Sequence, residues 1–370
     1  MAMGDGERAT ECHATGEVLQ PQHRVVLRAV REHLRRCIPA GPLTALCERW
    51  LTQLEDHLQE HGSAPCIDVP YLVAQGLGAN AEKTRTVAVF ATSIFLGCDL
   101  LDDFHDQAWP RELRSASVNT VSLAGSLLLS VIPTLVIAEI PDLSDAGRFH
   151  ACRMVAEYLQ RMAGGQADDL RSPWNPELSI DATQSRMMAK SGEEMALFCH
   201  FSALVTGCDA HLQQECAQFG REMAMALQII SDLTDLFEKP VSTDLQQGTG
   251  TLPLALHLAR LETGARKAFC GLWRESAHSP AARRRLQWAM CDSGAVAHAA
   301  VMIESYGERA KERLHGLPLH PASQHALQEE IATLSRYALA HLQAFLHHEP
   351  EKPSDPLFLH SRTLRKERTR

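Results

Sequence analysis

The sequence lacks the cysteine spacing of a disulfide-bonded or zinc-binding domain. Its 11 cysteines are an odd number, and no two of them form a C-x-x-C pair. A disulfide framework and a zinc ribbon both depend on paired spacings, so neither is expected. We expect the thiols to be reduced and mostly buried, as they are in cytoplasmic proteins.

A basic stripe and an apolar leader are also missing. Lys and Arg total 36 against 45 Asp and Glu, which gives a formal net charge of −9. No basic stripe stands out before the last residues, and this argues against nucleic-acid binding. The first residues, M-A-M-G-D-G-E-R, contain no apolar run of the secretory type. We therefore expect a cytoplasmic protein without a nucleic-acid partner.

No segment shows the alternation of apolar and polar residues that is typical of β-strands. The apolar spacing is helical over residues 24–60, with an interruption at 39–42, and again over 71–345 with several breaks. The intervening residues 61–70 contain glycine and two prolines, which predict a loop. The whole pattern predicts an all-α protein with ten or more helices.

These helices predict a single large domain over residues 23–345. Residues 1–22 are polar and aperiodic, and we expect them to be disordered. Residues 346–370 combine three prolines with several Arg and Lys side chains, which predicts a basic disordered tail.

One segment, residues 115–138, is uncharged and long enough to span a bilayer. Arg111 and Arg114 precede it and would be able to orient a span. However, the segment contains Asn119, Pro133 and several Ser and Thr residues, which lower its hydrophobicity. This polar content favours a buried core helix, so we expect no membrane span.

The segment Cys98–Asp106 concentrates acidic residues after a nearly apolar stretch. Asp99, Asp102, Asp103 and Asp106 follow the spacing i, i+3, i+4 and i+7, so a helix brings them onto one stripe. Carboxylates placed this close repel one another unless cations neutralise them. Their oxygens suit Mg²⁺, which completes its coordination with water and substrate phosphates. A solvated acidic helix end is the alternative to a metal site.

A second acidic element favours the metal site. Asp232 and Asp235, with Gln228 one turn earlier, share a face of a predicted helix. Helical bundles hold metal clusters with carboxylates that project inward from facing helices. A turn-rich loop with Lys239 follows, and Lys190 lies between the two acidic elements. For Lys190 alone the alternative is a solvated surface lysine; in this context we expect it to neutralise phosphate charge.

Five elements in this order resemble the motifs of the trans-isoprenyl diphosphate synthase, or polyprenyl synthetase, family, over residues 70–345. The elements are the first aspartate-rich motif at Asp102–Asp106, G-Q-x-x-D at Gly165–Asp169, K-T-G at Lys190–Gly192, the second aspartate-rich motif at Ser231–Asp235, and the loop Asp244–Pro253. The resemblance implies a divergent member with the class I terpenoid fold, a single all-α bundle.

The resemblance also implies a cofactor, a substrate and their ligands. The cofactor would be a cluster of three Mg²⁺ ions, or Mn²⁺, and the substrate an allylic prenyl diphosphate. Small residues before the first motif, Gly97 and Cys98, would leave room for a chain longer than geranyl. The implied metal ligands are Asp102, Asp103, Asp106, Asp232 and Asp235. The implied catalytic residues are Asp102, Asp103 and Lys190, and the implied substrate-binding residues are Gln166, Lys190, Gln228, Lys239 and Arg111.

The departures from the family pattern concern the metal site, the diphosphate site and the second substrate of chain elongation. Ser231 stands where elongating members have Asp, which removes one metal-facing carboxylate, and Thr249 stands where the later loop has Lys, which weakens the cationic side of the diphosphate site. The G-G-K-x-x-R-P element that binds isopentenyl diphosphate is missing, and Q-A-W-P-R-E-L-R, with Arg111 and Arg114, replaces the usual Arg-Arg-Gly. These differences weaken the site for isopentenyl diphosphate but leave diphosphate ionisation in place.

Three functions therefore stay open at this point. The favoured one is a prenyltransferase that joins an allylic diphosphate to isopentenyl diphosphate or to another acceptor. The second is a class I terpene synthase that cyclises one prenyl diphosphate. The third is a non-catalytic partner subunit of a prenyl synthase, and either a homodimer or a heterodimer is compatible with the sequence.

Overall fold

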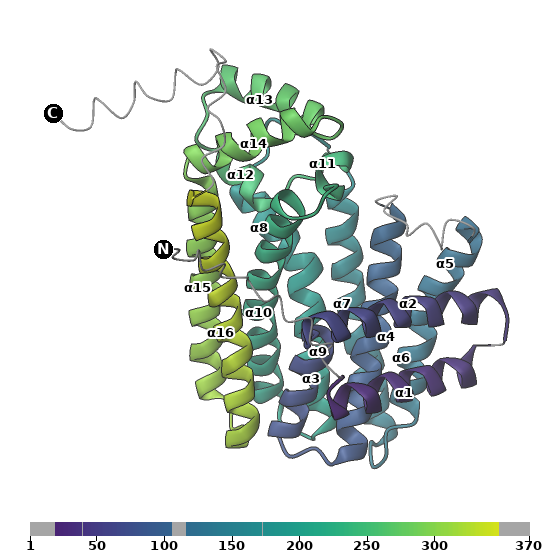
Figure 1. Ribbon diagram of the computed structural model, residues 1–370. Helices are drawn as coiled ribbons and strands as arrows, with labels where there is room; N and C mark the ends of the chain where they lie inside the picture. Colours follow the sequence, from purple (N-terminus) through teal and green to yellow (C-terminus); the bar gives the residue numbers. More distant parts are fainter. Residues whose placement is uncertain (1–18, 39, 106–115, 172, 348–370) are drawn as a thin grey trace, which may run out of the picture.

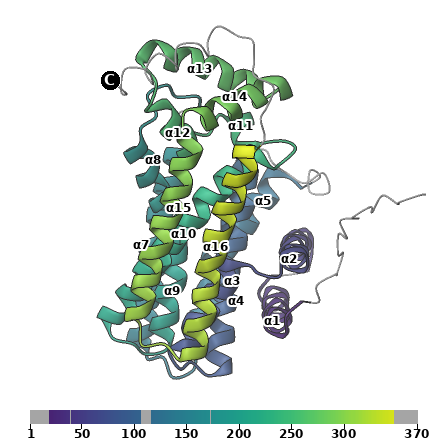
Figure 2. The same cartoon turned by 60° about the vertical axis from the view of Figure 1, so that its left-hand side comes forward.

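The computed structural model describes residues 19–38, 40–105, 116–171 and 173–347, and these contain helices and no strand. Long helices run side by side, and the helix pair α1–α2 crosses them on one side (Figure 1, Figure 2). At one end of the bundle, shorter helices cover the long ones. The all-α prediction is confirmed.

The long helices of the bundle are α4 (Ala81–His105), α7 (Asp145–Asp169), α9 (Glu193–Val205), α10 (Ala210–Phe237), α15 (Ala295–Gly316) and α16 (Pro321–His347). The crossing pair is α1 (Pro21–Cys37) and α2 (Pro42–His61), and α3 (Pro65–Gly76) leads from it into the bundle. The segments between α4 and α7 are α5 (Val118–Ser126), the π-helix η2 (Leu127–Val131) and α6 (Ile132–Ala138). The remaining segments are α8 (Ile180–Met187), the π-helix η3 (Met188–Gly192), α11 (Thr243–Gln247), α12 (Leu252–Leu258), α13 (Thr263–Ser276) and α14 (Pro280–Asp292).

The centre of the core lies where α4, α9 and α10 meet. Phe90 of α4 and Phe201 of α9 stack with 3.6 Å between ring centroids, and both are fully buried. Helix α9 is hydrophobic on nearly all sides, as expected for a helix enclosed by others. The described cysteines are free thiols, and none of them is exposed.

The loop predicted over residues 61–70 is wrong from residue 65 onward, because α3 begins there. Pro65 occupies the first turn, where its missing N–H removes no helical hydrogen bond. The Asp68 carboxylate accepts a hydrogen bond from the Ala64 N–H at 2.8 Å and caps this turn. Pro70 lies inside the helix, and its carbonyl accepts a hydrogen bond from the Ser202 hydroxyl of α9 at 3.0 Å. Packing on α9 thus outweighs the helix-breaking tendency of proline.

The uncharged segment forms α5, η2 and α6, and one face of it packs against α4. Val118–Ala138 is the one helical stretch of the described residues that is apolar and long enough to cross a membrane, with mean hydropathy 2.2. In its most apolar window 44% is buried, whereas Val118, Leu123 and Val131 are exposed. The core-helix prediction therefore describes one face of the segment, and the exposed apolar face was not predicted.

The domain limits can be compared only in part. Pro21 and Gln22, predicted to be disordered, form the first turn of α1, and His347 is the last residue of α16. Residues 1–18 and 348–370 lie outside the described residues.

Candidate active site

The last turns of α4 bring Asp102 to a lysine and a glutamine from two other helices. The Lys190 Nζ atom lies 2.7 Å from Asp102 Oδ1, and the Gln166 side-chain amide donates to the same oxygen at 2.8 Å. Lys190 Nζ is also 3.6 Å from Asp169 Oδ2. Asp103 follows on the same turn and is half-buried. Three of the predicted elements therefore converge on one point.

Local structure explains why Lys190 reaches this point. Lys190 lies in the π-helix η3, a type of irregular turn that is frequent at functional sites. Helix α7 approaches η3 closely at Gly165, where a Cβ atom would lie 2.9 Å from the Lys190 backbone nitrogen. Arg186, one turn earlier, binds Asp169 with 2.8 Å between Nε and Oδ1. Gly165 thus permits the contact between α7 and η3, and Asp169 links two cations beside Asp102.

On the facing helix α10, Asp232 points toward this region and is 4% exposed. Its carboxylate accepts hydrogen bonds from the Gln228 amide at 2.8 Å and from the Leu252 backbone N–H at 3.2 Å. Gln228 in turn accepts a hydrogen bond from the Ser191 hydroxyl at 2.6 Å, which ties α10 to η3. Burial raises the pKa of Asp232 to about 7 in spite of these bonds. The site thus holds a carboxyl group that gains from a bound cation.

The second aspartate of this motif has a different environment. Asp235 accepts hydrogen bonds from the backbone N–H groups of Thr243 and Asp244 at 3.1 and 3.2 Å, and from the Ser242 hydroxyl. Lys239 Nζ lies 3.3 Å from its Oδ1 atom, and the lysine side chain is 53% exposed. Asp235 and Lys239 therefore anchor the start of α11 in this structure. Their predicted roles with metal and substrate stay predictions.

Next to these groups, residues of α2, α3, α4, α9 and α10 line an inner pocket of about 390 Å³. Most of its wall is apolar, with contributions from Trp50, Leu54, Phe95, Leu96, Met195, Phe198, Ala224 and Leu227. Polar side chains also line it: Gln53, His57, Asp99, Ser191, Glu194, Gln228 and Ser231. An apolar pocket with a few convergent polar groups is the usual form of a small-molecule site.

Two acidic residues of this pocket are not among the predicted site residues: Asp99 was assigned only to the acidic stripe, and Glu194 was missed. Burial raises the pKa of Asp99, although its carboxylate accepts a hydrogen bond from the Trp50 indole at 2.7 Å. Burial likewise raises the pKa of Glu194 to about 7, against the effect of a hydrogen bond from the Cys98 thiol. The sequence did contain a signal: Glu194 follows Lys190 by four residues, and such residues share a helix face.

The small residue Gly97 has a packing role in the structure. A Cβ atom there would lie 2.8 Å from the side chain of Leu129, so η2 fills this space. Gly97 does not line the inner pocket. The preference for a chain longer than geranyl stays a prediction, and Gly97 itself serves here to let η2 pack against α4.

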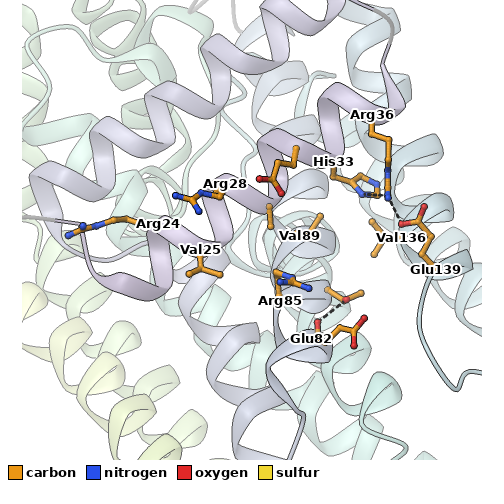
Figure 3. Close-up of a pocket in the computed structure, with 13 residues that line it drawn as sticks. Arg24, Val25, Arg28, His33, Arg36, Glu82, Arg85, Val89, Val136 and Glu139 are labelled. Atoms are coloured by element: carbon orange, nitrogen blue, oxygen red, sulfur yellow. Dashed lines mark hydrogen bonds and ion pairs between the residues drawn. The ribbon is translucent and has the colours of Figure 1, made fainter.

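A second and larger cavity, the outer cleft, lies between α1, the first half of α4 and the end of α6, with a volume of about 730 Å³ (Figure 3). Arg24, Arg28, Arg36 and Arg85 line it together with Glu32, Glu82 and Glu139. At 1.5 Å rise per residue, about 25 Å of helix separates Arg85 from Asp102. The outer cleft is thus remote from the carboxylate groups.

The predicted metal ligands have the oxygen donors that a divalent cation needs, but their side chains are not yet arranged around one point. Carboxylate oxygens from α4 and α10 are the donors that Mg²⁺ and Mn²⁺ prefer. Among the residues that the structure describes, no three acidic, His or Cys side chains already surround one point as a metal site. Asp106 and Arg111 lie outside the described residues. The buried Asp232 is the observation that favours a cation here.

Known proteins share this architecture. A polyprenyl synthase from Caulobacter crescentus, solved with calcium and isoprenyl diphosphate, superposes with a TM-score of 0.67 at 20% identity, over 86% of this chain and 94% of that one. A (2E,6E)-farnesyl diphosphate synthase of Mycobacterium tuberculosis is 23% identical over 276 residues, 71% of this chain and 75% of the relative.

Component 2 of the heptaprenyl diphosphate synthase of Bacillus subtilis is 27% identical over 110 residues, 28% of this chain and 32% of the relative. The match to that relative thus spans about a third of its length. The family model for polyprenyl synthetase matches residues 56–285, which include both acidic motifs, Gln166 and Lys190. The chain therefore belongs to the polyprenyl synthetase family.

Proposed function

We propose that this protein is a prenyltransferase that ionises an allylic prenyl diphosphate with the help of divalent cations. The observation that carries the proposal is the convergence of Lys190 and Gln166 on Asp102, beside a largely apolar pocket and with the buried Asp232 on the facing helix α10. The family match and the prenyl diphosphate synthases among its relatives support the same reaction class.

In this proposal the diphosphate lies between the ends of α4, η3 and α10. Lys190 donates to the departing diphosphate and neutralises part of its charge. Asp102, Asp103 and Asp232 hold the cations, with Asp106 and Asp235 as further candidate ligands. When bound, Mg²⁺ supplies Lewis-acid stabilisation of the leaving group. The apolar wall of the inner pocket binds the prenyl chain and excludes water.

A separate question is which molecule accepts the prenyl group. The missing G-G-K-x-x-R-P element argues against tight binding of isopentenyl diphosphate by this chain alone. A partner subunit is a second candidate role, because one relative is named as a component of a heptaprenyl diphosphate synthase. No comparison supports a terpene synthase, so the cyclase alternative is not carried further.

The test is incubation of the purified full chain with Mg²⁺ and geranyl, farnesyl or geranylgeranyl diphosphate, with and without isopentenyl diphosphate. Pyrophosphate release and mass analysis of products are the readouts. We expect release with at least one allylic substrate and its loss in a chelator. A folded protein that consumes none of these substrates would contradict the proposal and leave the partner-subunit role.

A further inference from the structure

Two acidic side chains of the inner pocket lie one helical turn from Asp102 and Lys190. Helix α4 runs toward Asp102, and α9 runs away from Lys190. Because residues three or four apart share a helix face, Asp99 lies one turn below Asp102, and Glu194 one turn below Lys190. Both line the inner pocket. The two acids therefore form a level directly beneath the groups that meet the diphosphate.

The next level down is apolar. Phe95, Leu96, Met195 and Phe198 line the pocket there. A prenyl diphosphate whose head meets Lys190 then has its first carbons at the level of the two acids and its chain among these apolar side chains. This placement rests on the proposed function. The carbon that undergoes substitution is thus close to carboxyl groups.

One of these carboxyl groups has an atom without a partner. Glu194 Oε1 is inaccessible to solvent and accepts no hydrogen bond from the described residues. A buried acceptor left unsatisfied costs about 1–3 kcal/mol. A hydrocarbon chain has no N–H or O–H to offer it. The Lys190 ammonium is already directed at Asp102 and Asp169. A ligand group that donates a hydrogen bond would remove this cost.

Exposed side chains border the pocket on the α2 side, so a ligand would approach Glu194 from there and reach Oε1 once the side chains that cover this atom move. Gln53 and His57 of α2 line the pocket and are exposed to solvent. Asp102 and Lys190 are not part of the pocket lining, and in the proposed function they lie around the diphosphate. A second substrate is therefore able to enter beside α2 while the allylic diphosphate occupies the upper level.

We propose that Glu194 is the proton acceptor for a second substrate that carries a hydroxyl or amine nucleophile. The C1–O bond of the allylic diphosphate breaks, and the diphosphate keeps the bonding electrons. A lone pair on the oxygen or nitrogen of the acceptor forms the new bond to C1, and the proton on that atom moves to the Glu194 carboxylate. The products are a prenyl ether or amine and pyrophosphate, and Glu194 later returns its proton to water.

The experiment uses the full chain with Mg²⁺ and geranyl diphosphate, and offers 1-propanol, propylamine or isopentenyl diphosphate as acceptor. The readout is the amount of geranyl propyl ether or geranylpropylamine per pyrophosphate released, by mass analysis. We expect wild type to capture at least one of the two probes. Glu194→Gln, which keeps the shape but accepts no proton, should lower this ratio at least tenfold, and Glu194→Asp should restore part of it. Glu32→Gln in the outer cleft is the matched control and should leave the ratio unchanged.

Thermal unfolding separates this role from a structural one. Because Glu194 holds an unsatisfied acceptor, Glu194→Gln and Glu194→Met should unfold at the wild-type temperature or higher. A lower midpoint, an unchanged capture ratio in Glu194→Gln, or elongation with isopentenyl diphosphate without capture of either probe would overturn the inference. Absence of pyrophosphate release in wild type would instead contradict the proposed function, and this inference with it.

Discussion

The two cavities differ in the way in which they hold charge. The outer cleft is the larger, about 730 Å³, but its charged side chains reach water; Arg36 and Glu139, which form an ion pair there, are both more than half exposed. The inner pocket, about 390 Å³, half-buries Asp99 and Glu194, and the partial loss of water raises the pKa of both. Holding a carboxyl group in an apolar wall costs stability and is typical of functional sites. Desolvation therefore marks the reactive site here, and cavity size does not.

The largest difference between the two cavities should appear in the rate of catalysis when a cationic side chain is removed from each region. Lys190→Met removes the cation that contacts Asp102, and we expect pyrophosphate release to fall about 10²–10³-fold, as for loss of a preorganised charge-stabilising group. The matched changes Arg28→Met and Arg85→Met in the outer cleft should leave the rate within twofold. Steady-state kinetics with a common allylic substrate provides the measurement. Equal losses in all three variants would remove the distinction.

The convergence of Lys190 and Gln166 on Asp102 was predictable because each residue belongs to a motif of fixed order. The all-α class was predictable from the apolar spacing. Glu194 was missed because its burial depends on the packing of α9 against α4; its spacing from Lys190 indicates a shared helix face but not that this face is buried. The anchoring of α11 by Asp235 was missed for a related reason: the i, i+3 spacing places two acids on one face but does not say which loop covers that face.

The next effect concerns the pH dependence of stability. The unfolded chain loses the Glu194 proton near pH 4.5, whereas burial keeps it in the folded protein up to about pH 7. The folded state thus binds more protons in this window, so the contribution of Glu194 to stability falls as pH rises and is constant above the window. Glu194→Gln removes this loss. The groups that face Glu194 are the same in both proteins: Cys66, Cys98, Asp99, Asp102, Lys190 and His57.

Urea unfolding of both proteins at several pH values checks this prediction. We expect the free energy of unfolding of Glu194→Gln relative to wild type to rise between pH 4.5 and 7, by up to about 3 kcal/mol. The corresponding variant of the outer cleft, Glu32→Gln, should show no such rise. A difference that stays constant with pH would mean that Glu194 titrates as an exposed residue.

A smaller effect should distinguish the two aspartates of the second motif by their contribution to stability. Asp235→Ala removes the acceptor for two backbone N–H groups at the start of α11, and we expect it to lower the free energy of unfolding by about 2 kcal/mol. Asp232→Asn should instead retain or raise stability at pH 8, because it removes a carboxyl group that is costly to ionise, while it lowers activity. If both variants lose only activity, Asp235 is a ligand and not an anchor.

The smallest effect belongs to the ion pair of the outer cleft. Arg36→Ala breaks an exposed ion pair with Glu139. Such pairs contribute roughly 0.2–1 kcal/mol to the free energy of unfolding. We expect a change in the free energy of unfolding of about 0.5 kcal/mol or less and no change in turnover. A loss of activity in this variant would assign the outer cleft a role in the reaction and weaken the contrast between the cavities.

The most direct measurement is pyrophosphate release from an allylic diphosphate by wild type and by the variant Asp102→Ala, Asp103→Ala, each with Mg²⁺ and with a chelator. The account predicts release by wild type with Mg²⁺ alone, and almost none in the other three samples, while circular dichroism shows both proteins to be helical. Undiminished release from the double variant, or from wild type in the chelator, would contradict the claim that the carboxylates of α4 and a divalent cation ionise the substrate.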